Sequence, residues 1–150
     1  MMEILRKLPK KCAALLMSAS LLLASAAPAM EIEKFDKMAA KDQSEYIVVL
    51  IEGAQQVLIK EGKKEFAAKI HALFTTTLPG DDAPVGIIEF ERNLARARLA
   101  DIRNLEKDPH APRLEVEDAM AVTLKKNGIE LPVGFYTVAS GFRPHYPPKR

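Results

Sequence analysis

The hydrophobic residues of this chain recur mainly at spacings of three and four, which is the period of an amphipathic α-helix. This pattern predicts helices over residues 43–61, 64–75, 85–107 and 114–126, with a further short helix opening at Pro132. The first of these helices is apolar around much of its girth, so we place it at the centre of the fold. We predict an all-α protein, a small irregular bundle of four to five helices.

Turn and capping residues separate the predicted helices. Asp42 followed by Glu45 has the spacing of a capping box and predicts the start of the first helix. Gly62 and Gly128 supply helix stops, and prolines within residues 78–84 and 108–112 mark loops. No internal repeat divides the chain. We therefore predict one domain over residues 30–142, followed by a Pro-rich C-terminal tail over residues 143–150.

Residues 1–29 have the three parts of a secretory signal peptide: a basic start, an apolar run over residues 12–24 and a small-residue end. Cleavage is expected after Ala29, because Glu31 and Glu33 follow at once; Ala26 is the other small-residue site. The alternative is an uncleaved membrane anchor, but the apolar run is shorter than the roughly 20 residues that a spanning helix needs. We expect a periplasmic or secreted bacterial protein, without stable membrane insertion after cleavage.

Removal of this leader changes the charge balance. Residues 1–29 hold four of the 22 Lys and Arg and one of the 20 Asp and Glu, so 18 basic and 19 acidic residues remain. The basic excess therefore belongs to the discarded segment, and a nucleic-acid partner is not expected.

Residues suited to metal or thiol chemistry are scarce. Cys12, the single cysteine, lies in the leader, so the mature chain has no disulfide and no thiolate ligand. His71, His110 and His145 are far apart in the sequence and lack the spacing of paired metal ligands. We find no nucleophile elbow and no phosphate-binding loop, so neither a catalytic residue nor a cofactor is predicted.

The helix over residues 85–107 carries charges inside its apolar stripe. Glu91 and Arg98, two turns apart, fall near the centre of a stripe formed by Ile87, Phe90, Leu94, Ala95, Ile102 and Leu105. One interpretation is a polar site between helices, in which Glu91, Arg98 and Tyr46 bind a small anionic or zwitterionic ligand. The other is an internal salt-bridge network in which Glu91 and Arg98 reach Glu117, Asp118 or Tyr46, because a buried charge needs a partner, or a groove edge where both side chains reach water.

Two other segments suggest binding. Arg92, Arg96 and Arg103 fall on the opposite face of the same helix, which we interpret as a solvated face. In the tail, Phe142, Arg143 and Tyr146 lie among prolines, a composition that suits docking on a partner as an extended segment or, alternatively, a frayed terminus.

The leading hypothesis for function is a non-enzymatic, exported protein-interaction module. It would bind another periplasmic or secreted protein through an exposed helix face or the tail. The alternative is a small-ligand-binding protein or minor enzyme with its site around Glu91 and Arg98.

Overall fold

The computed structural model describes residues 29–131, which fold into helices joined by short loops. The helices are α3 (Ile32–Asp36), α4 (Ala40–Lys60), α5 (Lys64–Thr75), α6 (Val85–Lys107) and α7 (Val116–Lys126). Within this range the only extended pairing is an isolated antiparallel bridge between Glu31 and Glu115. The prediction of a small all-α bundle is confirmed.

Some predicted segments fall outside the described residues. They are the leader up to residue 28, the short helix opening at Pro132, and the tail over residues 143–150. Among the helices of the described part, none is long and apolar enough to cross a membrane.

The helix boundaries follow the sequence pattern at most ends. α5 and α6 have the bounds predicted for them, and Gly62 adopts a φ of 76° after α4, as its role as a stop requires. The predicted capping box at Asp42 is wrong, because α4 begins at Ala40 with Ala39 as its N-cap. A capping box does occur at α7, where the Glu115 amide donates to Asp118 Oδ2 over 2.7 Å, and α7 begins at residue 116 rather than 114.

The early start of α4 has a tertiary cause. Gln43 and Ser44 are buried, and the Gln43 side-chain amide donates to the Phe35 carbonyl over 2.8 Å. This bond ties the first turns of α4 to α3, a helix of five residues that is too short to show a hydrophobic period. The sequence pattern therefore missed both α3 and the first turn of α4.

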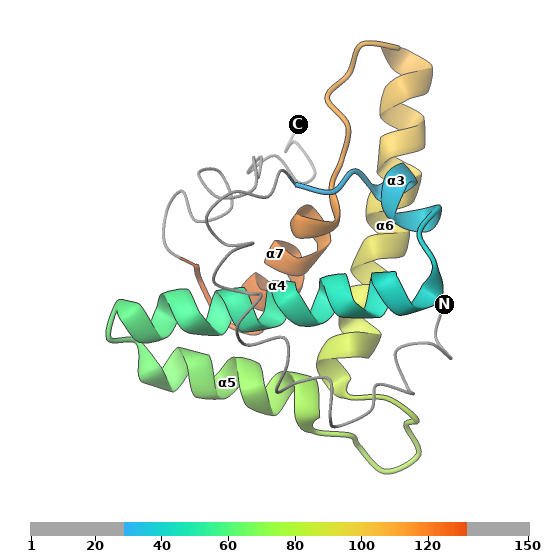
Figure 1. The fold of residues 1–150 in the computed structure, drawn as a ribbon. Helices are drawn as coiled ribbons and strands as arrows, with labels where there is room; N and C mark the ends of the chain where they lie inside the picture. Colours follow the sequence, from blue (N-terminus) through green and yellow to red (C-terminus); the bar gives the residue numbers. More distant parts are fainter. Residues whose placement is uncertain (1–28, 132–150) are drawn as a thin grey trace.

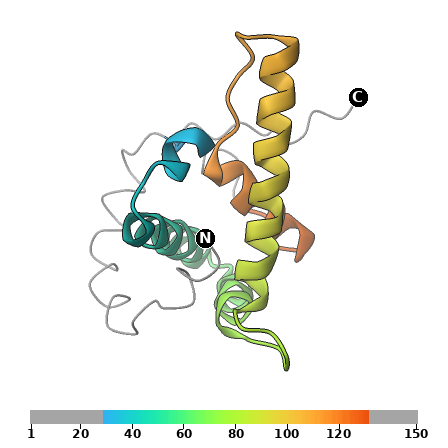
Figure 2. The ribbon, with the colours of Figure 1, turned by 90° about the vertical axis from the view of Figure 1, so that its right-hand side faces the viewer.

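The arrangement is a helical hairpin crossed by a longer helix (Figure 1). α4 and α5 run antiparallel and pack along their lengths, and α6 runs across them. α7 packs against α6, while α3 lies beside the middle of α6. Turned by 90°, the molecule shows the second half of α6 continuing beyond the hairpin (Figure 2). Residues 108–115 return alongside this half to reach α7.

The core is formed by side chains from α3, α4, α5, α6 and α7 and from the segment after α7. Phe35 and Phe90 are fully enclosed there, together with Ile32, Ile47, Leu58, Ile70, Leu94, Met120, Leu124 and Ile129. On α6 the buried line differs from the predicted stripe. It passes through Ile87, Phe90 and Leu94 as expected but then through Ala97 and Asp101, whereas Ala95 and Ile102 are exposed. The prediction that Ala95 and Ile102 are core residues is therefore wrong.

The crossing of α5 and α6 depends on a glycine. A Cβ atom on Gly86 would lie 2.8 Å from the Leu73 carbonyl oxygen and 2.8 Å from Phe74 Cδ1. Both distances are shorter than van der Waals contact, and the carbonyl belongs to the backbone of α5, which cannot rotate away. Gly86 thus sets how closely the start of α6 approaches the end of α5.

We predict that Gly86→Ala lowers the free energy of unfolding by about 1–3 kcal/mol, because the helices must separate to admit the methyl group. The direction of the change distinguishes the two cases, since replacing glycine by alanine in an open helical position raises the free energy of unfolding by about 1 kcal/mol. Ala95→Gly, at an exposed position of the same helix, is the control and should lose only that propensity. Urea unfolding measures both; a stabilised Gly86→Ala variant would contradict the close packing.

Candidate functional site

A carboxylate lies buried at the start of α7. Val116 to Met120 are all buried, so Glu117, in the first turn, points into the domain with none of its surface exposed. The Tyr46 hydroxyl from α4 donates to Glu117 Oε1, and the Met30 backbone nitrogen donates to Oε2 over 3.1 Å. Both carboxylate oxygens therefore have a partner, one from α4 and one from the segment before α3.

Burial raises the pKa of Glu117 to about 7, because the enclosed site disfavours its charged form. The bonds from Tyr46 and Met30 act in the opposite direction, and the neighbouring Asp118 adds to the rise. Glu117 is thus a carboxyl group that changes protonation near neutral pH inside the domain.

The segment that carries Met30 is held in place by backbone hydrogen bonds. The Val116 amide donates to the Met30 carbonyl over 2.9 Å, and the Ile32 amide donates to the Leu114 carbonyl over 3.3 Å. These bonds form the bridge between Glu31 and Glu115. Residues 30–32 are therefore fixed against residues 114–116, and the position of the Met30 nitrogen is set by this pairing.

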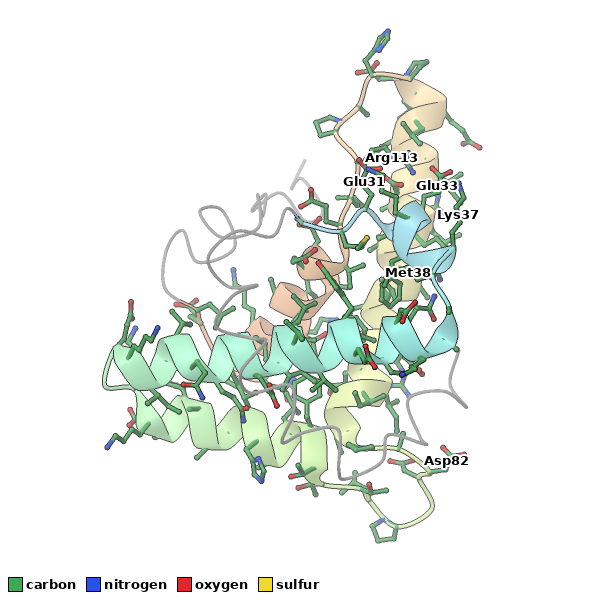
Figure 3. All side chains as sticks on the ribbon, in the orientation of Figure 1. Glu31, Glu33, Lys37, Met38, Asp82 and Arg113 are labelled. Carbon is green, nitrogen blue, oxygen red and sulfur yellow. The ribbon has the colours of Figure 1, made fainter. Side chains whose placement is uncertain are left out.

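A second buried carboxylate organises a charged cluster beside α3. Asp101 of α6 is 4% exposed and pairs with Arg113, whose Nη2 lies 2.9 Å from Asp101 Oδ2. The Leu114 amide donates to the other oxygen of Asp101 over 2.8 Å. Arg113 Nη1 also reaches Glu33 of α3, 3.0 Å away, and Lys37 lies 2.7 Å from the far oxygen of Glu33. Figure 3 shows Arg113, Glu33 and Lys37 together at this end of α3.

The pKa shifts in this cluster follow from the pairing. The hydrogen bond from Lys37, followed by that from Arg113, lowers the pKa of Glu33. The bond to Asp101 raises the pKa of Arg113 further above its ordinary value. The charged forms of Glu33 and Arg113 are therefore favoured, and the cluster joins α3, α6 and the loop before α7.

The residues predicted to bind a ligand are placed in different surroundings. Arg98 makes a two-pronged ion pair with Asp36 of α3, with Nε and Nη2 each 2.7 Å from a carboxylate oxygen. This pairing raises the pKa of Arg98. Tyr46 donates to Glu117, a contact that neither interpretation of the sequence predicted, since both treated Tyr46 as a neighbour of Glu91 and Arg98. Glu91 is partly buried at the border of the core-facing side of α6.

Of the three histidines, two lie in the described range. His71 and His110 are exposed, and no group of three or more acidic, histidine or cysteine side chains in residues 29–131 is placed to hold a metal ion. His145 and the predicted interaction residues Phe142, Arg143 and Tyr146 lie outside the described residues.

Asp36, Asp101 and Arg113 were not singled out from the sequence, and Met30 was named only as the expected start of the mature chain. For Asp101 a signal existed, because it follows Leu94 and Ala97 at the three-and-four spacing of the buried line. For Arg113, in a loop after Pro112, no periodic signal exists.

We predict that Arg113→Met lowers the free energy of unfolding by about 2 kcal/mol, because the buried Asp101 then loses its cationic partner. The matched control is Lys37→Met, which removes an exposed pair with Glu33 and should leave stability within the error of measurement. Equal effects of the two variants in urea unfolding would show that burial of Asp101 is not what makes Arg113 important.

We also predict that Tyr46→Phe lowers the free energy of unfolding by about 1–3 kcal/mol at pH 8, where Glu117 is ionised and needs its donor. In a Glu117→Gln background the same change should cost less than half as much, because the acceptor is no longer charged. A double-mutant cycle measures this coupling. If the two costs are equal, the bond between Tyr46 and Glu117 does not stabilise the fold.

The buried carboxylates and their partners join segments far apart in sequence. Comparisons with protein-family models, with curated proteins and with solved structures find no match to this chain.

Proposed function

We propose that this chain is an exported bacterial protein that acts by binding another protein through the outer face of α6. This face consists of the exposed residues Arg92, Ala95, Arg96, Leu99, Ile102 and Arg103. Export is the expectation from the leader. The observation that supports the binding surface is the exposure of Leu99 and Ile102, at 56% and 50%, between arginines on one side of a helix.

Single exposed apolar residues are common on proteins and need no explanation. Leu99 and Ile102 differ because they are three residues apart on one helical face and lie on the half of α6 that continues beyond the hairpin (Figure 2). A partner can approach this half from the outside without meeting α4 or α5. The shape therefore suits a helix or strand laid along α6.

The arginines of this face are not used in holding the fold. None of Arg92, Arg96 and Arg103 forms an ion pair with another residue in the described range, whereas Arg98 and Arg113 are both paired. Arginine is enriched at protein interfaces because its planar group packs on apolar surface and binds carboxylates in a two-pronged geometry. Three such groups around two apolar side chains form a mixed apolar and cationic surface.

This chemistry specifies the partner. An amphipathic helix with two apolar residues one turn apart, flanked by Asp or Glu, would match Leu99, Ile102 and the arginines. One acidic residue, Glu106, lies exposed near the C-terminal end of the face, so the positive charge is concentrated over residues 92–103. The small apolar area suits a transient complex rather than a permanent one.

The test is site-specific cross-linking with the full precursor expressed in its own host. We predict that a photoreactive amino acid at position 99 cross-links to a partner with an acidic amphipathic helix, and that Arg96→Glu with Arg103→Glu abolishes the product. The photoreactive residue at Thr77, in an exposed loop at the other end of α6, is the matched control and should give no such product.

Equal cross-linking at positions 77 and 99 would contradict the proposal, as would survival of the product after both charge reversals. A product containing two copies of this chain would instead make the outer face a self-association surface. Circular dichroism of the charge-reversed variant must match the wild type, since its changes lie on exposed side chains.

The small-ligand interpretation around Glu91 and Arg98 stays a prediction. A ligand carboxylate would have to displace Asp36 from Arg98, with which it makes two bonds of 2.7 Å. The outer face of α6 carries no such competing partner for its arginines within the described residues, which is why we prefer it.

A further inference from the structure

The backbone nitrogen of Met30 is singled out both by the structure and by the sequence. In the structure it is 3.1 Å from Oε2 of the buried Glu117. In the sequence it belongs to the peptide bond after Ala29, the expected cleavage site of the leader. Cleavage at this bond would turn the atom that already faces a buried carboxylate into a terminal amine.

We propose that the bond between Ala29 and Met30 is the processing site, and that Glu117 is a preformed site for the α-ammonium group released there. The mature N-terminus is then bound inside the domain by an ion pair rather than left free in solvent. This inference rests on the export part of the proposed function and is independent of the outer face of α6.

The chemistry is a peptide-bond hydrolysis by a signal peptidase, with water as the co-reactant. The bond between the Ala29 carbonyl carbon and the Met30 nitrogen breaks, and the oxygen of water completes the Ala29 carboxylate. The Met30 nitrogen gains the protons that make it an ammonium. One amide donor is thus replaced by a positive group with three donors.

The surrounding backbone fixes where this group goes. The Met30 carbonyl accepts from the Val116 amide over 2.9 Å, one residue before Glu117, so the nitrogen and the carboxylate are held within reach of each other. Ala29 and Met30 are both half-buried. A peptidase cannot enclose the bond between Ala29 and Met30 while both residues are packed against the domain. Hydrolysis therefore comes first, and the new terminus binds beside Glu117 afterwards.

The ion pair also removes an electrostatic cost. The titratable groups that act on Glu117 are Tyr46 of α4 and Asp118 of α7, and the segment before α3 contributes the Met30 nitrogen. With an amide at that nitrogen, none of these groups within residues 29–131 is positively charged, and burial keeps the pKa of Glu117 near 7. An ammonium in the same place lowers this pKa, and the carboxylate in turn raises that of the amine.

The two forms therefore depend differently on pH. With an amide, the folded pKa of Glu117 lies above its unfolded value, so stability is present at low pH and is lost as the pH rises through about 7. With an ammonium this loss disappears, and stability falls only when the amine deprotonates, above its ordinary pKa of about 8.

The experiment compares two full precursors exported and processed in the same bacterial host. One is the wild type; the other has Ser-Gly inserted between Ala29 and Met30, which leaves the −1 alanine intact and moves the terminal amine two residues away from Glu117. Intact mass gives the N-terminus of each product. Urea unfolding at pH 5 and pH 8 then gives the ratio of folded to unfolded protein.

We expect the wild-type product to begin at Met30 and its folded-to-unfolded ratio to fall less between these pH values than that of the insertion product, by roughly fiftyfold. Other titrating groups are common to both chains and cancel. Glu117→Gln in both precursors should abolish the difference.

Three results would overturn the inference. A wild-type product beginning at Ala27 leaves export intact but removes the ammonium from the site. An uncleaved chain in the cytoplasm contradicts export itself. A product beginning at Met30 whose pH dependence equals that of the insertion product shows that the amine does not pair with Glu117. Because the insertion does not alter Glu117, this comparison holds even if the glutamine variant fails to fold.

Discussion

Two buried carboxylates, Asp101 and Glu117, are the constraint around which the domain is assembled. An unpaired carboxylate in the interior costs several kcal/mol, so each must find partners. Asp101 is paired by Arg113 and the Leu114 amide, and Glu117 by Tyr46 and the Met30 nitrogen. Through these partners Glu117 joins the start of the domain and α4 to α7, and Asp101 joins α6 to the loop before α7.

The helices could be predicted because each buries an apolar face at a regular spacing. α5 and α6 have the predicted bounds for this reason. α3 and the start of α4 could not, because their positions depend on the contact between Gln43 and Phe35 and not on local periodicity. On α6 the same limit applies, since a buried Asp101 turns the core-facing side toward Ala97 and leaves Ile102 in solvent.

The candidate site was predictable only in part. The sequence indicates Tyr46 and Glu117 only as possible neighbours of Glu91 and Arg98, whereas in the structure the two contact each other. For Arg98 the sequence leaves a ligand site and an internal ion pair open, and its carboxylate partner in the structure is Asp36, on a helix that the sequence did not reveal. Arg98 is therefore paired, whereas Arg92, Arg96 and Arg103 form no ion pair within the described residues. These three arginines lie on the same face of α6 as Leu99 and Ile102, which is why we place the proposed binding there.

If the terminal amine pairs with Glu117, this side chain is enclosed and its pKa depends on whether an amide or an ammonium stands at the Met30 nitrogen. The most direct measurement is a carbon-13 NMR titration of the Glu117 side-chain carboxyl in the processed protein and in the product with Ser-Gly before Met30. We predict a pKa close to 7 in the extended product and a clearly lower pKa in the processed protein. An ordinary glutamate pKa in both would contradict the burial of Glu117, and a raised pKa in both would contradict its pairing with the terminal amine.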